Sequence, residues 1–310
     1  MKAVLLDGDS LGGDLTLNEF KNLPIELTVY PTTQPEEVAE RVQHADIILV
    51  NKVVLSADLL AHVPQVKYIG VLATGMNNVD TDYCRQVGIT VNNVDGYGTD
   101  SVAQHTMMLL LNLATSFVPT HQQVQRGDWC RSPFFCLLDN PIIELAGKHL
   151  VIVGYGTLGH RFAQLARAFG MQVSVAARPG TQVAGREPLD ALLPRADVLS
   201  LHCQLSPQTD KLINADRLAK MKSSALLLNT ARGGLIDEPA LLAALKSGQI
   251  AGAALDSLSS EPPPADHPLL NAELPHLLIT PHTAWAAKES RLRLVQIAAD
   301  RLATYLDDSA

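Results

Sequence analysis

The sequence predicts an α/β protein built from two domains, each with a parallel sheet. Short β-branched runs alternate with helical patterns along almost the whole chain, which is typical of parallel sheets covered by helices. The alternation occurs in two successive series, and 310 residues are enough for more than one domain. We therefore expect two α/β domains.

The first series predicts strands at residues 2–6, 27–30, 46–50, 68–71 and 90–92. Helical patterns at residues 35–42 and 80–87 lie between these strands. A long, mostly apolar helical pattern at residues 101–124 follows, and we expect it to join the two domains. Residues 129–143, which include Pro133 and Pro141, predict an irregular connecting loop.

The second series predicts strands at residues 150–153, 172–175, 198–202, 225–229, 251–255 and 277–280. A helix is expected at residues 160–169, directly after the first of these strands. A final helix is expected at residues 288–306. If this last helix packs on the first domain, that domain is discontinuous in the sequence.

The composition indicates a soluble globular protein that binds neither nucleic acid nor a membrane. Hydrophobic residues make up 47% of the chain, charged residues 18%, and the net charge is -8. No apolar run approaches the roughly 20 residues that span a bilayer, and the first residues resemble a strand more than a signal peptide. The four cysteines have the spacing of neither a zinc site nor a disulfide framework: Cys84, Cys130, Cys136 and Cys203. We expect reduced thiols, no metal and a cytoplasmic location.

A glycine pattern of the form G-x-G-x-x-G occurs at Gly154, Gly156 and Gly159. It follows an apolar strand and opens a helix, which is the context of a dinucleotide-binding turn. Gly154 would allow the tight turn, Gly156 the close approach of a pyrophosphate, and Gly159 close packing of helix and strand. Free N–H groups at the helix N-terminus would then bind the phosphates. The alternative is an ordinary glycine turn of an α/β fold.

Arg178 stands where NAD-binding sites usually carry an acidic residue. That residue bonds the ribose 2′-hydroxyl about 20 residues after the glycines, and this region reads Ala176, Ala177 and Arg178. Without a carboxylate, a 2′-phosphate is not repelled, and an arginine offers it bidentate charged hydrogen bonds. We therefore expect NADP(H) to be favoured, with NAD(H) possible. The alternative is a surface arginine in a less selective site.

Three ionisable residues follow predicted strands of the second series. Arg232, Glu261 and His282 each come shortly after such a strand. Carboxyl ends of parallel strands meet at one edge of a sheet, so we expect the three side chains to point into one crevice. Taken singly, each is better explained by an ordinary role: Arg232 as a turn cation, Glu261 as a solvated loop acid and His282 as a loop histidine.

Together these residues fit the reduction of a 2-oxo acid. Arg232 can bind the substrate carboxylate or the 2-oxo oxygen and polarise the carbonyl. His282 can give a proton to the nascent alkoxide, because imidazole titrates near neutral pH. Glu261 can hold the tautomer of the ring and favour its charged form. A nicotinamide would supply the hydride.

The chain resembles the D-isomer-specific 2-hydroxyacid dehydrogenases over essentially its whole length. The segments that carry the resemblance are ATGMNNVD from Ala73, YGTDSVAQH from Tyr97, VGYGTLG from Val153, LHCQLSPQT from Leu201, NTARGGLIDE from Asn229, ALDSLSSEPPP from Ala254 and TPHTAW from Thr280. Within the family, the chain looks most like bacterial glycerate dehydrogenases, also called hydroxypyruvate reductases. The resemblance implies reduction of hydroxypyruvate or glyoxylate to D-glycerate or glycolate.

The resemblance also implies a domain arrangement. It implies two Rossmann-like domains with parallel sheets. The NAD(P)-binding Rossmann domain, residues 101–284, is inserted into a discontinuous, flavodoxin-like substrate domain, residues 1–100 plus 285–310. Members are commonly homodimers. Trp129 is expected in the dimer contact or near the partner's active site, and a loop-anchoring core tryptophan is the equal alternative.

The resemblance carries further contacts over to this chain. Backbone N–H groups of Thr74 and Gly75 would hold the substrate carboxylate, with Arg232 and His282. The remaining residues would meet the cofactor: Thr157, Leu158, His202, Gln204, Thr209, Thr230, Ala231, Arg232, Asp256 and His282, with Asp256 on the carboxamide. Alternatives remain a phosphite or formate-type dehydrogenase, or a nucleotide-sensing corepressor of the same fold. Glu261 argues against the formate enzymes, which have glutamine there.

Overall fold

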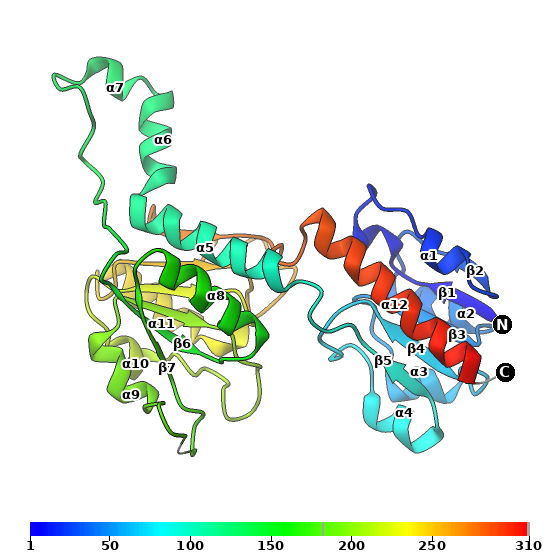
Figure 1. The fold of residues 1–310 in the computed structure, drawn as a ribbon. Helices are drawn as coiled ribbons and strands as arrows, with labels where there is room; N and C mark the ends of the chain where they lie inside the picture. The colour runs from blue at the N-terminus through cyan, green and yellow to red at the C-terminus, as the bar shows by residue number, and fades with distance from the viewer. Residues whose placement is uncertain (182, 309–310) are drawn as a thin grey trace. The chain divides into compact units, whose positions relative to one another are not determined.

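The computed structural model describes residues 1–181 and 183–308 and contains two compact units. Unit 1 comprises Met1–Gly98 and the chain from Ala286 onward, and unit 2 is Thr99–Trp285. Each unit contains one sheet, and every strand pairing in both sheets is parallel (Figure 1). The predicted fold class is confirmed.

Unit 1 has five strands in the order β2-β1-β3-β4-β5. The strands are β1 (Lys2–Leu5), β2 (Glu26–Val29), β3 (Ile47–Val50), β4 (Tyr68–Val71) and β5 (Thr90–Asn92). The central strands β3 and β4 are buried along their whole length because helices cover both faces of the sheet. The edge strand β2 is mostly exposed.

Helices of unit 1 are short except for the last. They are α1 (Asn18–Lys21), α2 (Val38–Val42), α3 (Ala57–Ala61), α4 (Thr81–Val87) and α12 (Lys288–Asp308), with 3-10 turns η1 (Gly8–Leu11) and η2 (Pro35–Glu37). The helix expected at residues 35–42 is therefore a 3-10 turn followed by a short α-helix. Gln34 and Glu37 form a capping box around Pro35 at its start.

The final helix packs on the first series of strands. The Arg291 guanidinium binds Asp14 at 2.5 Å, and the Tyr305 ring lies 4.7 Å from that of Tyr68 on β4. Arg301 also donates to the Asn93 carbonyl after β5. Both ends of the chain consequently belong to unit 1.

Unit 2 has six strands in the order β11-β10-β9-β8-β6-β7. The strands are β6 (His149–Val153), β7 (Gln172–Val175), β8 (Val198–Leu201), β9 (Leu226–Asn229), β10 (Gly252–Leu255) and β11 (Leu277–Ile279). The strands after β6 run first to one side of it (β7) and then to the other (β8). Open α/β sheets usually bind ligands at such a reversal of strand order, at the carboxyl ends of the strands, which here is the end of β6.

Alternate residues of the strands form two core layers in unit 2. On β6, Leu150 and Ile152 pack with α5 (Thr99–Thr115) and α8 (Thr157–Ala168), whereas Val151 and Val153 face the opposite layer. That layer contains α9 (Leu189–Leu192), α10 (Ala215–Leu218), α11 (Glu238–Lys246) and the turns η3 (Leu193–Arg195) and η4 (Gly233–Leu235).

The single helix expected at residues 101–124 is wrong. The structure has two helices there, α5 and α6 (Phe117–Gln125), separated at Ser116, which has left-handed backbone angles (φ 47°, ψ 41°). Pro119 explains the break, because its ring would clash with the Thr115 carbonyl of a continuous helix. Ser116 Oγ donates to the Pro141 carbonyl at 2.6 Å and stabilises the bend.

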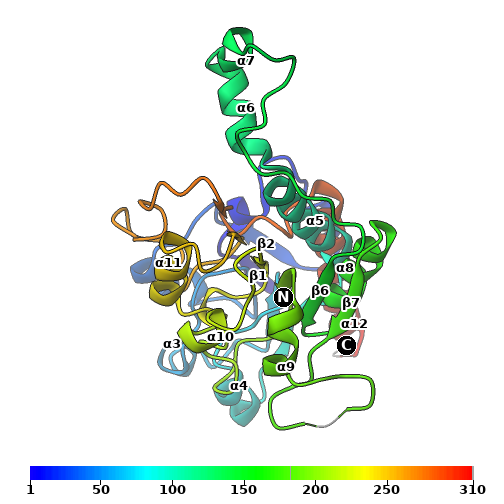
Figure 2. The same ribbon diagram turned by 90° about the vertical axis from the view of Figure 1, so that its left-hand side faces the viewer.

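An arm extends from unit 2, formed by α6, α7 (Asp128–Arg131) and the following residues up to Ile142 (Figures 1 and 2). The loop expected at residues 129–143 thus begins in a short helix and is irregular afterwards. Trp129 is 51% exposed, so it is not a core tryptophan, although its indole N–H donates to the Phe135 carbonyl at 2.8 Å.

Candidate active site

The glycine turn directly follows β6, where the strand order of unit 2 reverses. Gly154 has a φ of 92°, and a Cβ there would lie 2.5 Å from the Cys203 nitrogen. A Cβ on Gly159 would lie 2.1 Å from the Gly154 carbonyl oxygen. These two glycines are therefore required by packing, whereas Gly156 faces open space.

Helix α8 begins at Thr157, earlier than the predicted residue 160. Its first-turn N–H groups include those of Thr157 and Leu158, and within the described residues no side chain caps them. An open glycine followed by uncapped N–H groups matches what a pyrophosphate requires. The residues present thus fit a dinucleotide.

His202 lies against the glycine turn and is uncharged at neutral pH. Burial lowers the pKa of its imidazole to about 4. Nε2 lies 2.8 Å from Ser200 Oγ, and the buried Nδ1 has no hydrogen-bond partner among the described residues. Burial also raises the pKa of the Cys203 thiol to about 11. The His202 imidazole and the Cys203 thiol next to the glycine turn are therefore both uncharged at neutral pH.

The other residues expected along this cleft occupy the loop after β8. The side chain of Gln204 is exposed, and its carbonyl accepts the Thr209 hydroxyl at 2.8 Å. The Ser206 backbone N–H donates to the same hydroxyl at 2.8 Å. Thr209 thus closes the loop that carries Gln204.

Arg178 lies exposed just beyond β7. Its carbonyl accepts the Thr181 backbone N–H at 3.0 Å and the Thr181 hydroxyl at 2.9 Å, which forms a tight turn. The nearby acid Glu187 binds Arg195 through both oxygens at 2.8 Å. The carboxylate of this loop is thus already neutralised. No described acidic group, in residues 1–181 or 183–308, pairs with the Arg178 guanidinium.

Asn229 shapes the loop that carries Arg232. Its buried side chain accepts the Ala231 N–H at 3.0 Å and donates to the Arg232 carbonyl at 2.9 Å. The Arg232 guanidinium donates to the Ala231 carbonyl at 2.7 Å, and Thr230 Oγ1 lies 2.9 Å from Thr106 Oγ1.

Glu261 and His282 form a direct pair. His282 Nδ1 lies 2.6 Å from Glu261 Oε2, and the Leu258 N–H donates to Glu261 Oε1 at 2.9 Å. Both side chains are about one-third exposed. With Nδ1 bonded to the carboxylate, Nε2 is the ring nitrogen left for chemistry.

Asp256 holds the loop of His282 in place. Its carboxylate accepts the Thr280 hydroxyl and the N–H groups of Thr283 (3.0 Å) and Ala284 (2.8 Å). Burial pushes the pKa of Asp256 upward, but hydrogen bonds from His105, Thr280 and the two N–H groups outweigh it and hold this pKa below its ordinary value. The side chain is 2% exposed, so the carboxamide contact expected for it competes with a satisfied internal network.

The structure brings the loops of all three expected catalytic residues together. They follow β9, β10 and β11, which are neighbours in the sheet. A Cβ on Gly233 would lie 1.9 Å from the Leu258 carbonyl carbon, so the loop of Arg232 touches the segment that binds Glu261. Glu261 in turn binds His282.

Asn229 and His105 lie in two of the segments that carry the family resemblance, NTARGGLIDE and YGTDSVAQH, but the sequence alone assigns neither of them a supporting role. Asn229 acts on its own loop, and His105 acts on a residue of another segment. His105 Nε2, which lies 3.0 Å from Thr280 Oγ1, sits on an apolar helix where it resembles an ordinary core residue. Only the folded chain shows these contacts.

Thr74 and Gly75 follow β4 at the carboxyl edge of the sheet in unit 1. The Thr74 hydroxyl donates to the Val94 carbonyl at 2.9 Å, and the Asn93 amide donates to the Thr74 carbonyl at 2.7 Å. These two bonds fix the conformation of the loop, whose backbone N–H groups at Thr74 and Gly75 are the groups expected to hold the substrate carboxylate.

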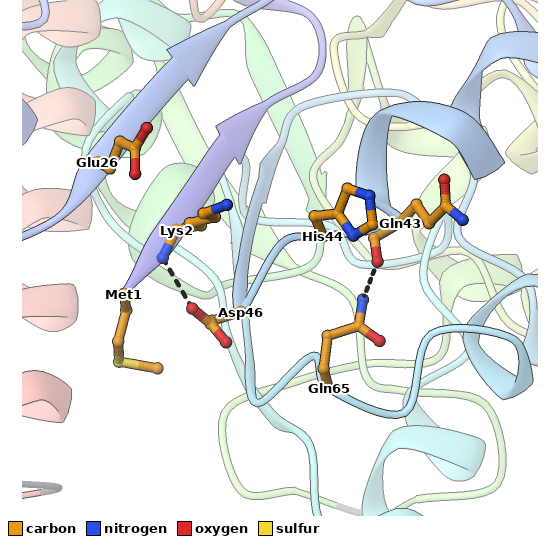
Figure 3. A pocket seen from close by; sticks show the side chains of 7 residues that line it. All are labelled: Met1, Lys2, Glu26, Gln43, His44, Asp46 and Gln65. Carbon is orange, nitrogen blue, oxygen red and sulfur yellow. Dashed lines mark hydrogen bonds between the residues drawn. The ribbon is translucent and has the colours of Figure 1, made fainter.

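Unit 1 also contains two cavities. One, of about 580 Å³, lies at the amino-terminal edge of the sheet and is lined by Met1, Lys2, Glu26, Gln43, His44, Asp46 and Gln65. Its polar groups bind one another, for example Gln65 and the Gln43 carbonyl at 2.8 Å (Figure 3). The other, of about 470 Å³, lies at the carboxyl edge and is lined by Asp7, Asp9, Ser10, Pro31, Thr32, Thr33, Lys52 and Val53. Only the carboxyl edge is the usual ligand side of such sheets.

The described chain offers no group of three or more metal-binding side chains, and none of its described helices is long and apolar enough to cross a membrane.

The lowered pKa of His202, whose Nδ1 is buried, predicts a pH dependence of stability. Because its folded pKa of about 4 lies below the ordinary 6.5, the unfolded chain binds more protons between these values. Its contribution is therefore complete above pH 6.5 and is lost as the pH falls toward 4, by up to about 3 kcal/mol. Denaturant unfolding at several pH values should show that the free energy of unfolding falls less steeply between pH 6.5 and 4 for His202→Gln than for the wild type. A His202 resonance that titrates near pH 6.5 by NMR would contradict the assignment.

Comparison with known proteins agrees with this geometry. Residues 107–284 match the family model described as D-isomer specific 2-hydroxyacid dehydrogenase, NAD binding domain. The glycerate dehydrogenase of Methylorubrum extorquens is 45% identical over 97% of this chain and 93% of its own. The hydroxypyruvate reductase of Blautia hydrogenotrophica is 41% identical over 100% of this chain and 98% of its own.

A solved structure has the same fold along nearly the whole chain. It is an NADPH-dependent glyoxylate/hydroxypyruvate reductase from Sinorhizobium meliloti in complex with NADP and malonate. Its TM-score is 0.82, with 25% identity over 98% of this chain and 93% of that one. The chain belongs to the D-isomer-specific 2-hydroxyacid dehydrogenase family.

Proposed function

We propose that this protein reduces a small 2-oxo acid, hydroxypyruvate or glyoxylate, to the D-2-hydroxy acid with NAD(P)H. The observation that carries the proposal is the Glu261–His282 pair at 2.6 Å beside the loop of Arg232. The names of the two relatives and of the solved structure support the substrate class.

In this proposal unit 2 binds the cofactor and unit 1 contributes to substrate binding, with domains at residues 101–284 and at 1–100 plus 285–310. The cofactor would be held by Gly154, Gly156, Gly159, Thr157, Leu158, Arg178, His202, Gln204, Thr209, Thr230, Ala231 and Asp256. When bound, its nicotinamide supplies the hydride. The residues of this chain do the rest.

Arg232 and the N–H groups of Thr74 and Gly75 bind and orient the substrate carboxylate. A guanidinium also stabilises the negative charge that develops on the 2-oxo oxygen. His282 Nε2 gives its proton to that oxygen as it becomes an alkoxide. Glu261 holds the ring in the required tautomer through Nδ1 and stabilises its charged form.

The direct test is a reductase assay with purified protein, followed by loss of NAD(P)H absorbance. Hydroxypyruvate or glyoxylate should be turned over. His282→Ala should lower kcat about 10²- to 10⁴-fold, because general acid catalysis contributes about that much, while cofactor affinity measured by fluorescence stays close to wild type. Absence of turnover with every small 2-oxo acid, or full turnover by His282→Ala, would refute the proposal.

We also propose that NADP(H) is the preferred cofactor. The support is Arg178 in a turn whose acid Glu187 is paired with Arg195, together with the half-buried Arg186, whose guanidinium lies 6.0 Å from the Tyr155 ring of the glycine turn. Two cations on one loop suit the 2′-phosphate of NADP(H).

Arg178→Asp should therefore lower the affinity for NADPH far more than the affinity for NADH, by a factor of about ten or more. The reason is that a charged hydrogen bond to the 2′-phosphate is lost and a repulsive carboxylate is added. Affinities for both cofactors should be measured by fluorescence titration. Lys246→Asp, an equal charge change at the end of α11, should affect neither. Equal weakening of both cofactors by Arg178→Asp would remove the assigned role.

We further propose a homodimer formed through the arm. Its most exposed apolar side chains are Phe117, Trp129, Phe134, Phe135, Leu138 and Ile142, and Phe135 is 90% exposed. So many large apolar groups on one projection are typical of a surface that another chain covers, and the family commonly forms dimers.

Sedimentation equilibrium should show a dimer for the wild type. Phe135→Asp combined with Leu138→Asp should give a monomer, because two carboxylates would be buried without partners. Val87→Asp, at an exposed apolar position of α4, is the matched control and should remain dimeric. A monomeric wild-type protein would contradict the proposal.

A further inference from the structure

Glu261 lies in a long connection between β10 and β11. None of the described residues 256–276 belongs to a helix or a strand. Connections of this length without secondary structure are uncommon in compact domains, and their position must be set by specific contacts.

Glu238 binds this connection on both sides of Glu261. Its Oε1 accepts the Ser259 N–H at 2.8 Å, and its Oε2 accepts the Ser259 hydroxyl at 2.6 Å. His267 Nε2 lies 3.3 Å from the same Oε2. The side chains of Glu238 and His267 are only 12% and 8% exposed. One carboxylate therefore clamps the segments before and after Glu261.

The clamp is itself fixed. Glu238 is the first residue of α11, and the preceding Asp237 caps that helix by accepting the Ala240 N–H at 3.1 Å. A helix N-terminus stabilises a carboxylate. The Leu269 N–H donates to His267 Nδ1 at 3.3 Å, so the ring proton lies on Nε2, the nitrogen that is 3.3 Å from Glu238 Oε2.

The segment that Glu238 holds contacts both the loop of Arg232 and Glu261. Leu258, next to Ser259, contacts Gly233 in the loop of Arg232 and donates its N–H to Glu261. A small shift of this segment would move the carboxylate away from His282 and disturb the loop of Arg232. Misplacement by about 1 Å can cost about 10²-fold in rate.

We propose that Glu238 is a positioning residue that, through Ser259 and His267, aims the Glu261 carboxylate at His282. This inference rests on the proposed function, in which the pair stabilises a charged imidazole. It predicts that loss of Glu238 mimics loss of the Glu261 charge, which a residue with a purely structural role would not do.

The test is the pH profile of kcat/KM in the direction of reduction, where activity falls as the acid loses its proton. Glu261→Gln should move this alkaline limb to lower pH by about one unit or more, because an uncharged partner no longer stabilises the imidazolium. Glu238→Ala should move it in the same direction and lower kcat about 10- to 100-fold. Glu238→Ala combined with Glu261→Gln should be little worse than Glu261→Gln alone, as expected for residues that act as one unit.

Asp237→Ala is the matched control, since it weakens the start of the same helix without touching the connection. It should lower the melting temperature and leave the limb unmoved. Ser259→Ala removes one contact of Glu238 and keeps the Glu238–His267 contact, so it should fold even if Glu238→Ala does not. It should move the alkaline limb in the same direction as Glu238→Ala, by a smaller amount.

The outcomes separate the two proposals. If Glu261→Gln moves the limb but Glu238→Ala and Ser259→Ala do not, or if Asp237→Ala moves it equally, the positioning role is overturned and the proposed function stands. If Glu261→Gln itself leaves the limb unmoved, the role of the carboxylate in the proposed function fails, and the positioning role fails with it.

Discussion

The hydrogen bond between Glu261 and His282 is the interaction on which the rest of the site depends. It joins side chains from two loops, and each loop is held by a separate buried carboxylate. Asp256 collects the N–H groups and hydroxyl around His282, while Glu238 clamps the connection that carries Glu261. The parallel sheet makes this possible, because β10 and β11 are neighbours and their carboxyl ends lie side by side.

The same edge of the sheet supplies the environment for a dinucleotide. The glycine turn follows β6, where the strand order reverses. Packing against Cys203 forbids a side chain at Gly154, and packing against the Gly154 carbonyl forbids one at Gly159. Below the turn, His202 and Cys203 are uncharged because burial disfavours both of their charged forms. The positive end of α8 and the cations after β7 are then the local charges that a phosphate would meet.

The sequence was sufficient for the fold class and for the family, because alternating β-branched and helical runs and the ordered motifs are local signals. The prediction of a single helix at residues 101–124 was wrong, because Pro119 interrupts the helix that the apolar run predicts. The joining of Glu261 to His282 could be anticipated from their places after strands, and their catalytic roles stay predictions. The contacts of Glu238, His267 and His105 could not be anticipated, since they join residues whose proximity exists only after folding.

The most direct measurement is a crystal structure of the protein with oxidised cofactor and oxalate, a planar mimic of a 2-oxo acid that cannot be reduced. The account predicts that the Arg232 guanidinium binds the oxalate, that His282 Nε2 lies within hydrogen-bond distance of an oxalate oxygen, and that Glu261 still bonds Nδ1. Oxalate bound elsewhere, or bound with Arg232 and His282 turned away from it, would contradict the account.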